Sequence, residues 1–472
     1  MALTLGLTNS LIKTPNVEGI SRLKNVVLVT IDCLRADYTD LCDQYGAVAP
    51  NLNKLARDST IFCNAFSHGS TTQSSFPAIL TSTYPIMYGG YPHLSSSRIT
   101  LSEVLQRHGF TTGAFTGQNP FLSRFFGYNR GFKVFEDFAV PKSVSTCEDM
   151  KFFFKNYDFA IRKCLTKLAY GLWKALPYAP ADMVVSRAMD FIKKNASERF
   201  FLWVHFMDVH FPYYPPPKYV SMPRWKIRNA NLSILRRKVK KDYFSEIKSL
   251  YAASIRYVDE NLGRLLDYLK DEKLKDSTAI IVTSDHGEEF FEHGDFGHST
   301  KLYDELLHVP LIIFTNGLLT QSRVRGVVGQ TVIAPTVLSI VNLPKPSVFL
   351  GKDLLTSNEN GSEEQSVISE CSHRWAFPMS IIFDLKYLQY AVRTWKWKFI
   401  SYPKLGKSEL YDSSKDPHEL NNVAEGNPEI VEKFRGLVDR HMQFEMKTMK
   451  HHYKSAPLDD ALSNRLRALG YA

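Results

Sequence analysis

Short apolar runs alternate along the chain with longer segments in which apolar residues recur every three or four positions. The first pattern is typical of strands buried on both faces of a sheet, and the second of amphipathic helices. We expect strands at 25–32, 199–206, 278–287 and 309–314, helices at 50–59, 185–195 and 251–271, and a helix followed by a strand at 99–117. This alternation predicts an α/β fold with a large, mainly parallel sheet flanked by helices on both faces.

The pattern changes after residue 355, where the polar loop TSNENGSEEQS occupies 356–366. Beyond this loop, 391–400 alternates like a strand and 427–442 has the spacing of a helix. We therefore expect a smaller C-terminal α/β subdomain after the large domain. The predicted parts are an N-terminal extension at 1–24, the large domain at 25–355 and the subdomain at 356–472.

The charge balance favours anionic partners. The 472 residues carry a formal net charge of +10, which suits phosphate or sulfate esters, acidic glycans, membrane surfaces or nucleic acid. Two apparent insertions, at 141–180 and 223–241, are rich in basic residues and suit a substrate rim, packing on the large domain, or peripheral contact with anionic lipid. No segment resembles a nucleic-acid-binding module, so we expect no nucleic acid partner. The oligomeric state is left open.

The cysteines and the N-terminus bear on the compartment. The six cysteines are widely scattered with no CxxC pair, which predicts mostly free thiols in a reducing compartment. The first residues lack the basic and apolar regions of a signal peptide, and no apolar run approaches 18 residues. We therefore expect a cytoplasmic protein, with any membrane contact peripheral.

Candidate chemistry lies where two predicted strands end. Asp32 closes the first strand, and Asp285 and His286 close the strand at 278–287. Ligands of open α/β sheets gather at the carboxyl ends of strands, and Asp and His bind divalent metals such as Zn²⁺ and Mn²⁺, while Ca²⁺ prefers oxygen. The simpler alternatives are a helix cap for Asp32 and a hydrogen-bonded loop histidine for His286. Three such residues at buried strand ends favour one divalent metal ion, whether Ca²⁺, Mn²⁺ or Zn²⁺.

A second candidate is the hydroxyl-rich stretch HGSTTQSSFPAILTSTYP at 68–85. An unassisted hydroxyl is a poor nucleophile near neutral pH and requires a base or a metal. The alternative is structural, because Thr71 and Thr72 can cap a helix that begins near Ser74. Both roles are compatible, since a helix N-terminus also attracts an anion.

Six stretches in order resemble the sulfatase-type members of the alkaline phosphatase superfamily. They are NVVLVTIDCLRADYT, the hydroxyl-rich stretch ending in LTSTYP, HFMDVHFPYYPP, TSDHGEEFFEHGDFGHS, LYDELLHVPLIIF and ELYDSSKDPHELNNVA. The resemblance runs from about residue 25 to about residue 430. It implies an alkaline-phosphatase-like large α/β domain with a smaller C-terminal α/β subdomain, and metal-dependent hydrolysis of an anionic ester. A glycan and a lipid are the candidate sources of that ester.

The resemblance also bears on the hydroxyls. Sulfatases carry Cys-x-Pro-Ser-Arg, whose Cys becomes formylglycine, and counting back from Leu80, Thr81 and Pro85 places Thr72 where that Cys stands. Formylglycine cannot form from Thr by this route, but phosphodiesterase-like and phosphoglycerol-transferase-like relatives use Thr as the nucleophile. Thr72 is thus expected to be a nucleophile and metal-bound hydroxyl, with Thr71 or Ser70 as alternatives.

Four further residues are candidates for the site, two of them through the resemblance. His210 and His298 stand where sulfatases place substrate-binding or acid residues, and His298 falls close to a position that often carries Lys. The simpler alternatives are a buried, hydrogen-bonded histidine for His210 and a surface-loop histidine for His298. Lys301 and Arg35 are candidate contacts for the anion from their charge. The alternatives are a solvated lysine for Lys301 and, as the preferred interpretation of Arg35, an ion pair with Asp37.

Two other sequence features qualify the resemblance. His205, on a predicted strand, is more simply a core histidine, and Cys33 replaces the second of two acids found at this point in many sulfatases. The leading hypothesis is a hydrolase of sulfate, phosphate or phosphonate esters that uses Thr72. The alternatives are a phosphoglycerol-type transferase and an inactive sulfatase fold that binds an anionic glycan or lipid.

Overall fold

The computed structural model allows most of the chain to be described. The described residues are 23–39, 41–42, 48–138, 178–235, 239, 241–298, 300–355, 365–376, 380–383 and 385–449. Most of the expected N-terminal extension and of the expected insertion at 141–180 lies outside these residues, as does most of the polar loop at 356–366.

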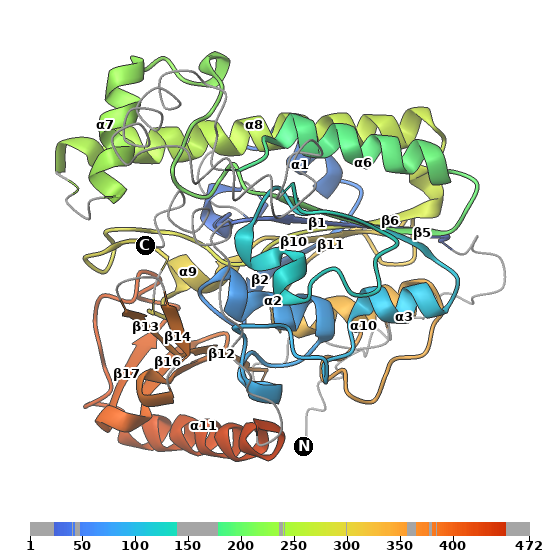
Figure 1. The fold of residues 1–472 in the computed structure, drawn as a ribbon. Helices are drawn as coiled ribbons and strands as arrows, with labels where there is room; N and C mark the ends of the chain where they lie inside the picture. Colours follow the sequence, from blue (N-terminus) through green and yellow to red (C-terminus); the bar gives the residue numbers. More distant parts are fainter. Residues whose placement is uncertain are drawn as a thin grey trace, which may run out of the picture.

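A nine-stranded sheet forms the centre of the molecule, in the order β11-β2-β10-β6-β1-β5-β3-β4, with β9 also paired to β2 (Figure 1). The strands are β1 Asn25–Ile31, β2 Thr60–Phe66, β3 Thr111–Phe115, β4 Val134–Glu136, β5 Phe200–Phe206, β6 Thr278–Ser284, β9 His308–Val309, β10 Leu311–Phe314 and β11 Ser322–Gly329. The pairs of β1 with β5 and β6 are parallel, as are those of β3 with β4 and β5 and of β11 with β2. The predicted α/β fold is confirmed.

Strand β10 runs antiparallel to both of its neighbours, β6 and β2. A parallel partner would need a crossover that returns the chain to the starting edge of the sheet, usually by a helix. The segment between β6 and β10 instead contains the short strands β7 Glu289–Phe290 and β8 Phe296–Gly297 and the four-residue helix α9 Asp304–Leu307. The chain therefore re-enters the sheet in the opposite direction.

Helices cover both faces of the sheet, because successive residues of the buried strands point to opposite sides. In β1, Val27 and Val29 belong to one apolar core, whereas Val26 and Leu28 belong to the other. The first core includes residues of α1 Pro50–Ala56, α6 Ala181–Asn195, α7 Arg224–Leu235 and α8 Phe244–Asp271. The second includes residues of α2 Thr72–Thr81, α3 Leu101–Arg107 and α10 Ile333–Ile340 (Figure 1).

A separate antiparallel sheet of four strands forms the smaller C-terminal subdomain. Its strands, in spatial order, are β12 Val367–Cys371, β15 Gln389–Arg393, β16 Trp397–Tyr402 and β17 Lys407–Asp412, with the hairpin β13 His373–Ala376 and β14 Ser380–Phe383 nearby in sequence. Helix α11 Pro428–Met449 packs on one face through Phe434 and Val438. Ile400 and Tyr411 belong to an apolar cluster shared with Phe66 of β2.

One predicted element of the subdomain has a different form. The segment 391–400 was expected to be a single strand, but it contains parts of β15 and β16, which pair antiparallel. The turn between them is closed by Thr394, whose backbone N–H donates to the carbonyl oxygen of Trp397 and whose hydroxyl accepts from the N–H of Trp397.

Among the described residues, no helix is both long and apolar enough to cross a lipid bilayer.

The prediction of free thiols is wrong for Cys42 and Cys63, which form a disulfide. Cys42 follows β1 and Cys63 lies on β2, at a sequence separation of 21. Their spacing carries no signal for the bond, because the folding of the chain between the two strands brings them together. Among the described residues, Cys33 and Cys371 are buried and are not joined in a disulfide.

Candidate active site

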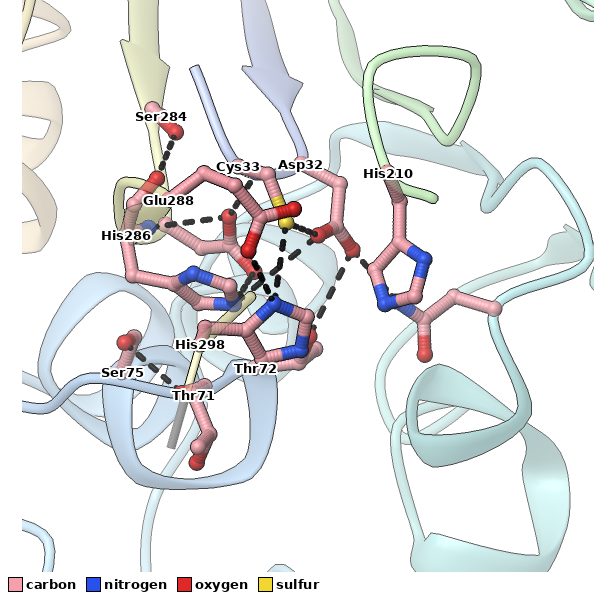
Figure 2. A network of polar contacts seen from close by, with 12 residues as sticks. Asp32, Cys33, Thr71, Thr72, Ser75, His210, Ser284, His286, Glu288 and His298 are labelled. Atoms are coloured by element: carbon pink, nitrogen blue, oxygen red, sulfur yellow. Dashed lines mark hydrogen bonds and ion pairs between the residues drawn. The ribbon is translucent and has the colours of Figure 1, made fainter. Parts of the chain in front are cut away.

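The predicted chemical residues converge at the carboxyl ends of the central strands, as expected for an open α/β sheet. Asp32 directly follows β1, Asp285 and His286 follow β6, and His210 follows β5. Because β1 lies between β5 and β6, these side chains meet beyond the carboxyl ends of three adjacent central strands. All four are buried, and Figure 2 shows Asp32, His286 and His210 with Cys33, Thr72 and His298 around a common centre.

Asp285 and His286 each direct one unsatisfied atom into this centre. The imidazole of His286 donates from Nδ1 to the carbonyl oxygen of Gly287 at 2.8 Å, which leaves a lone pair on Nε2. That Nε2 lies 3.5 Å from Asp285 Oδ2 and 3.8 Å from Asp32 Oδ1. Neither Asp285 Oδ2 nor His286 Nε2 has a hydrogen-bond partner among the described residues.

Buried polar atoms without partners are costly, and two of them, Asp285 Oδ2 and His286 Nε2, converge here beside the carboxylate of Asp32. Burial and the charge of Asp32 raise the pKa of Asp285 to about 6, because two carboxylates share one buried space. A divalent cation would satisfy both the unpaired atoms and the excess negative charge. The residues present therefore fit the metal that the sequence suggested.

The hydroxyls of Thr71 and Thr72, at the start of helix α2, have different surroundings. Thr71 is the N-cap residue, and it forms a reciprocal capping box with Ser74. Thr72 is the first residue of the helix, and its hydroxyl donates to Asp32 Oδ2 at 3.4 Å. The two roles considered for this stretch therefore fall to two neighbouring residues. Thr71 caps the helix, and Thr72 faces Asp32, the acid that follows β1.

His210 and His298 form the other side of the site (Figure 2). The ring centroid of His298 lies 4.8 Å from that of His210 and 4.5 Å from that of His286. Burial lowers the pKa of His210 to about 4 and that of His298 to about 3. Both imidazoles are therefore neutral at pH 7 before an anion enters.

Cys33 and Glu288 support these groups. The thiol of Cys33 donates to Asp32 Oδ1 at 3.0 Å and lies 3.5 Å from Nδ1 of His298. Burial and the nearby charge of Glu288 raise the pKa of Cys33 well above its ordinary value, so the thiol stays protonated. Glu288 Oε1 lies 3.0 Å from His298 Nδ1, and its Oε2 accepts from the hydroxyl of Tyr213 at 2.9 Å.

Sequence reasoning missed two residues of the site. Asn119 lies just after β3 and donates from its amide nitrogen to Asp32 Oδ2 at 2.8 Å. A polar residue at the end of a predicted strand was the available signal, but its use required the strand order. The second missed residue is Glu288, which lies in the motif TSDHGEE. His205, predicted as a core histidine, is buried and also lies 3.3 Å from Asp32 Oδ2.

Arg35 and Lys301, the two predicted anion contacts, form ion pairs with carboxylates of the chain. Arg35 binds Asp37 through Nε and Nη2 at 2.9 and 2.7 Å and contacts Glu292 through Nη1 at 2.7 Å. The preferred pairing of Arg35 is therefore observed, and this geometry gives no support to a substrate contact. Lys301 donates to both carboxylate oxygens of the buried Glu289 at 2.9 Å. Its predicted contact with substrate would require this pair to open.

The comparisons with known proteins agree with the geometry. Residues 24–343 match the profile of the family described as Sulfatase, and residues 291–449 match N-sulphoglucosamine sulphohydrolase, C-terminal. Arylsulfatase K of Bos taurus is 23% identical over 469 residues, which cover 88% of this chain and 82% of that protein. An arylsulfatase of Clostridium perfringens is also 23% identical, over 89% of this chain and 94% of that protein.

Solved structures share the fold at low identity. Phosphonate monoester hydrolase of Agrobacterium radiobacter superposes with a TM-score of 0.67 at 18% identity, over 92% of this chain and 100% of that one. A structure described as a complex with its substrate D-glucosamine-2-N,6-O-disulfate has a TM-score of 0.66 at 18% identity, with the same two coverages. These likenesses confirm the large α/β domain with a smaller subdomain.

Proposed function

We propose that this chain, which belongs to the sulfatase family, hydrolyses phosphate or phosphonate esters in preference to sulfate esters, with Thr72 as the nucleophile. Family membership makes it a hydrolase of sulfuric or phosphoric esters. Its net charge of +10 suits an anionic ester derived from a glycan or a lipid.

One observation carries the proposal. The hydroxyl of Thr72 lies at the N-terminus of α2 and donates to Asp32, whose other oxygen faces the unpaired Nε2 of His286. The N-terminus of a helix favours an approaching anion, so the ester and the hydroxyl are drawn to the same place. Asp32, Asp285 and His286 would hold a divalent cation, which supplies positive charge beside the hydroxyl and the ester oxygens.

The chain's own groups account for the movement of protons. Thr72 Oγ1 forms a bond to phosphorus or sulfur while the bond to the leaving oxygen breaks. The Thr72 proton passes to a neutral imidazole, His298 or His210, and the imidazolium then gives it to the leaving oxygen. Glu288, 3.0 Å from His298 Nδ1, stabilises the imidazolium form of His298. Water then cleaves the Thr72 ester and restores the hydroxyl.

The preference for phosphorus rests on the identity of residue 72. Threonine cannot supply the formylglycine that sulfatases form from cysteine, but a threonine hydroxyl can attack phosphorus directly. If an alcohol replaces water in the second step, the same arrangement acts as a phosphoglycerol-type transferase. The two outcomes share the covalent Thr72 ester and differ only in the acceptor.

The test measures nitrophenol release from a sulfate ester, a phosphate monoester, a phosphate diester and a phosphonate monoester. Metal-stripped protein is reloaded in turn with Ca²⁺, Mn²⁺ and Zn²⁺. We expect phosphorus esters to be cleaved, Thr72→Ala to lose at least about 10³-fold in kcat/KM, and Thr72→Ser to recover part of it. Thr71→Ala is the matched control, because it removes a neighbouring hydroxyl that caps the helix and should leave turnover intact.

A covalent intermediate gives an independent readout. Rapid acid quench followed by mass spectrometry should find one phosphoryl group on the peptide that contains Thr72. Turnover that persists in Thr72→Ala refutes the proposed nucleophile. Preferential cleavage of sulfate that depends on Thr72 would instead show that the preference for phosphorus is wrong. If the metal-loaded chain cleaves none of the four esters, the inactive binding protein becomes the better description.

A further inference from the structure

A second cluster of metal-type donors lies in the C-terminal subdomain and shares no residue with the active site. His441 and Glu445 are four positions apart on α11, so their side chains project from the same face of the helix. Glu370 approaches them from β12. All three are buried, with exposed fractions of 7%, 1% and 0%. The cluster therefore joins the last helix to the edge strand of the small sheet.

The three side chains point one donor atom each at the same place. His441 Nε2 contacts Glu370 Oε1 directly and lies 3.5 Å from Glu445 Oε1. One ligand atom from each residue lies within 4.8 Å of those of the others. Glu445 Oε1 has no hydrogen-bond partner among the described residues, although the side chain is almost fully buried.

The remaining carboxylate oxygens are already fixed. Glu370 Oε2 accepts from the backbone N–H of Ile86 at 3.0 Å, and Glu445 Oε2 accepts from the hydroxyl of Tyr390 at 3.2 Å. Each carboxylate is thus oriented by one oxygen and presents the other to His441. Two buried carboxylates that converge in this way repel unless a proton or a cation lies between them.

We propose that Glu370, His441 and Glu445 bind a structural Zn²⁺ ion. Carboxylate oxygens and an imidazole nitrogen are ligands that Zn²⁺ accepts, whereas Ca²⁺ and Mg²⁺ favour sites made of oxygen alone. Three protein ligands leave a fourth position for water. The unpaired oxygen of Glu445 gains a partner in this arrangement, which a hydrogen-bonded Glu370–His441 pair does not provide.

The site would fasten the subdomain to the large domain. Glu370 binds the N–H of Ile86, and the ring of Tyr84 lies 4.3 Å from the ring of His441, edge to face. Tyr84 and Ile86 belong to the segment that directly follows α2, the helix that carries Thr72. Zn²⁺ at this position therefore stabilises the docking of α11 behind the candidate active site. The proposal is independent of the ester chemistry.

The experiment uses the full chain with Asp285→Asn, which replaces one anionic donor of the candidate active site with a neutral amide and so weakens metal binding there. Zn²⁺ is titrated by calorimetry into the metal-stripped protein, and the melting temperature is measured with and without Zn²⁺. We expect one Zn²⁺ to bind and the melting temperature to rise by about 2 °C or more. Adding Glu445→Gln should weaken this binding by at least about 10-fold and abolish the rise.

Glu432→Gln is the matched control, because it removes a carboxylate from an exposed position of the same helix and should retain the Zn²⁺ effect. Glu445→Gln keeps the size of the side chain, and a circular dichroism spectrum verifies its fold. As a second measurement, Co²⁺ added in place of Zn²⁺ should give a visible absorption band that His441→Gln loses. Equal Zn²⁺ binding and equal melting shifts in Glu445→Gln and Glu432→Gln would overturn the proposal and identify the cluster as a metal-free ion pair.

Discussion

The Cys42–Cys63 disulfide gives a prediction with a magnitude that follows from its position. The bond joins the segment after β1 to strand β2, so it ties together the two parts of the chain that deliver Asp32 and Thr72. A cross-link removes conformational entropy from the unfolded chain by an amount that depends on the loop it closes. For the sequence separation of 21, the chain-entropy relation gives about 3 kcal/mol at 25 °C.

We expect reduction, or the double substitution Cys42→Ala with Cys63→Ala, to lower the free energy of unfolding by about 3 kcal/mol. The assay is urea denaturation of the oxidised protein with and without dithiothreitol. The double variant is the control, because reductant should not change its midpoint. A thiol count in denaturant should find two fewer reactive thiols in the oxidised chain than in the reduced chain.

An equal thiol count in the two states would refute the bond, and an unchanged midpoint after reduction would refute the entropic reasoning. A confirmed bond would count against the reducing, cytoplasmic setting expected from the cysteine spacing, because disulfides persist mainly in oxidising compartments.

Three further predictions follow from single contacts. Thr71→Ala should cost about 1 kcal/mol of stability in a thermal melt, because it removes the cap of α2, while kcat/KM stays unchanged. Burial raises the pKa of Asp208 from 3.8 to about 8, so between these values the folded chain retains a proton that the unfolded chain has lost. Stability from this group should fall as pH rises, by up to about 1.4 kcal/mol per unit, and urea melts of Asp208→Asn should lack that fall. Arg35→Ala should destabilise the chain by roughly 2–3 kcal/mol, because Asp37 and Glu292 lose their partner, and a rise in KM would show that Arg35 also binds substrate.

The hydrophobic pattern identified the central strands because they are buried on both faces. Strands β1, β5 and β6 are fully buried and read as continuous apolar runs. Strand β11 was not predicted, because it lies at the edge of the sheet, its first residues are exposed, and it carries Arg323 and Arg325. Strand β2 has the polar Asn64 within it and lacked a clear pattern. Sequence periodicity reports burial, so it is weakest for strands that are partly exposed.

The site was predictable where chemistry coincides with the end of a recognised strand. Asp32, Asp285 and His286 satisfied that condition, and the structure brings them together. Asn119 depends on the adjacency of β3 and β5, which no local pattern encodes. Arg35 illustrates the reverse case, because its charge suggested an anion while its partners are fixed by the fold.

Two departures from the resembled sulfatase pattern meet in space. By the sequence resemblance, Cys33 is expected where many sulfatases have a second acid, and His298 close to a position that often carries Lys. The thiol of Cys33 lies 3.5 Å from Nδ1 of His298, and burial leaves both groups neutral at pH 7. The first change removes a negative charge and the second removes a positive charge, so together they preserve the net charge around the ester. Such compensation is expected if the site still binds an anionic ester, since an uncompensated loss of either charge would alter the affinity for the anion.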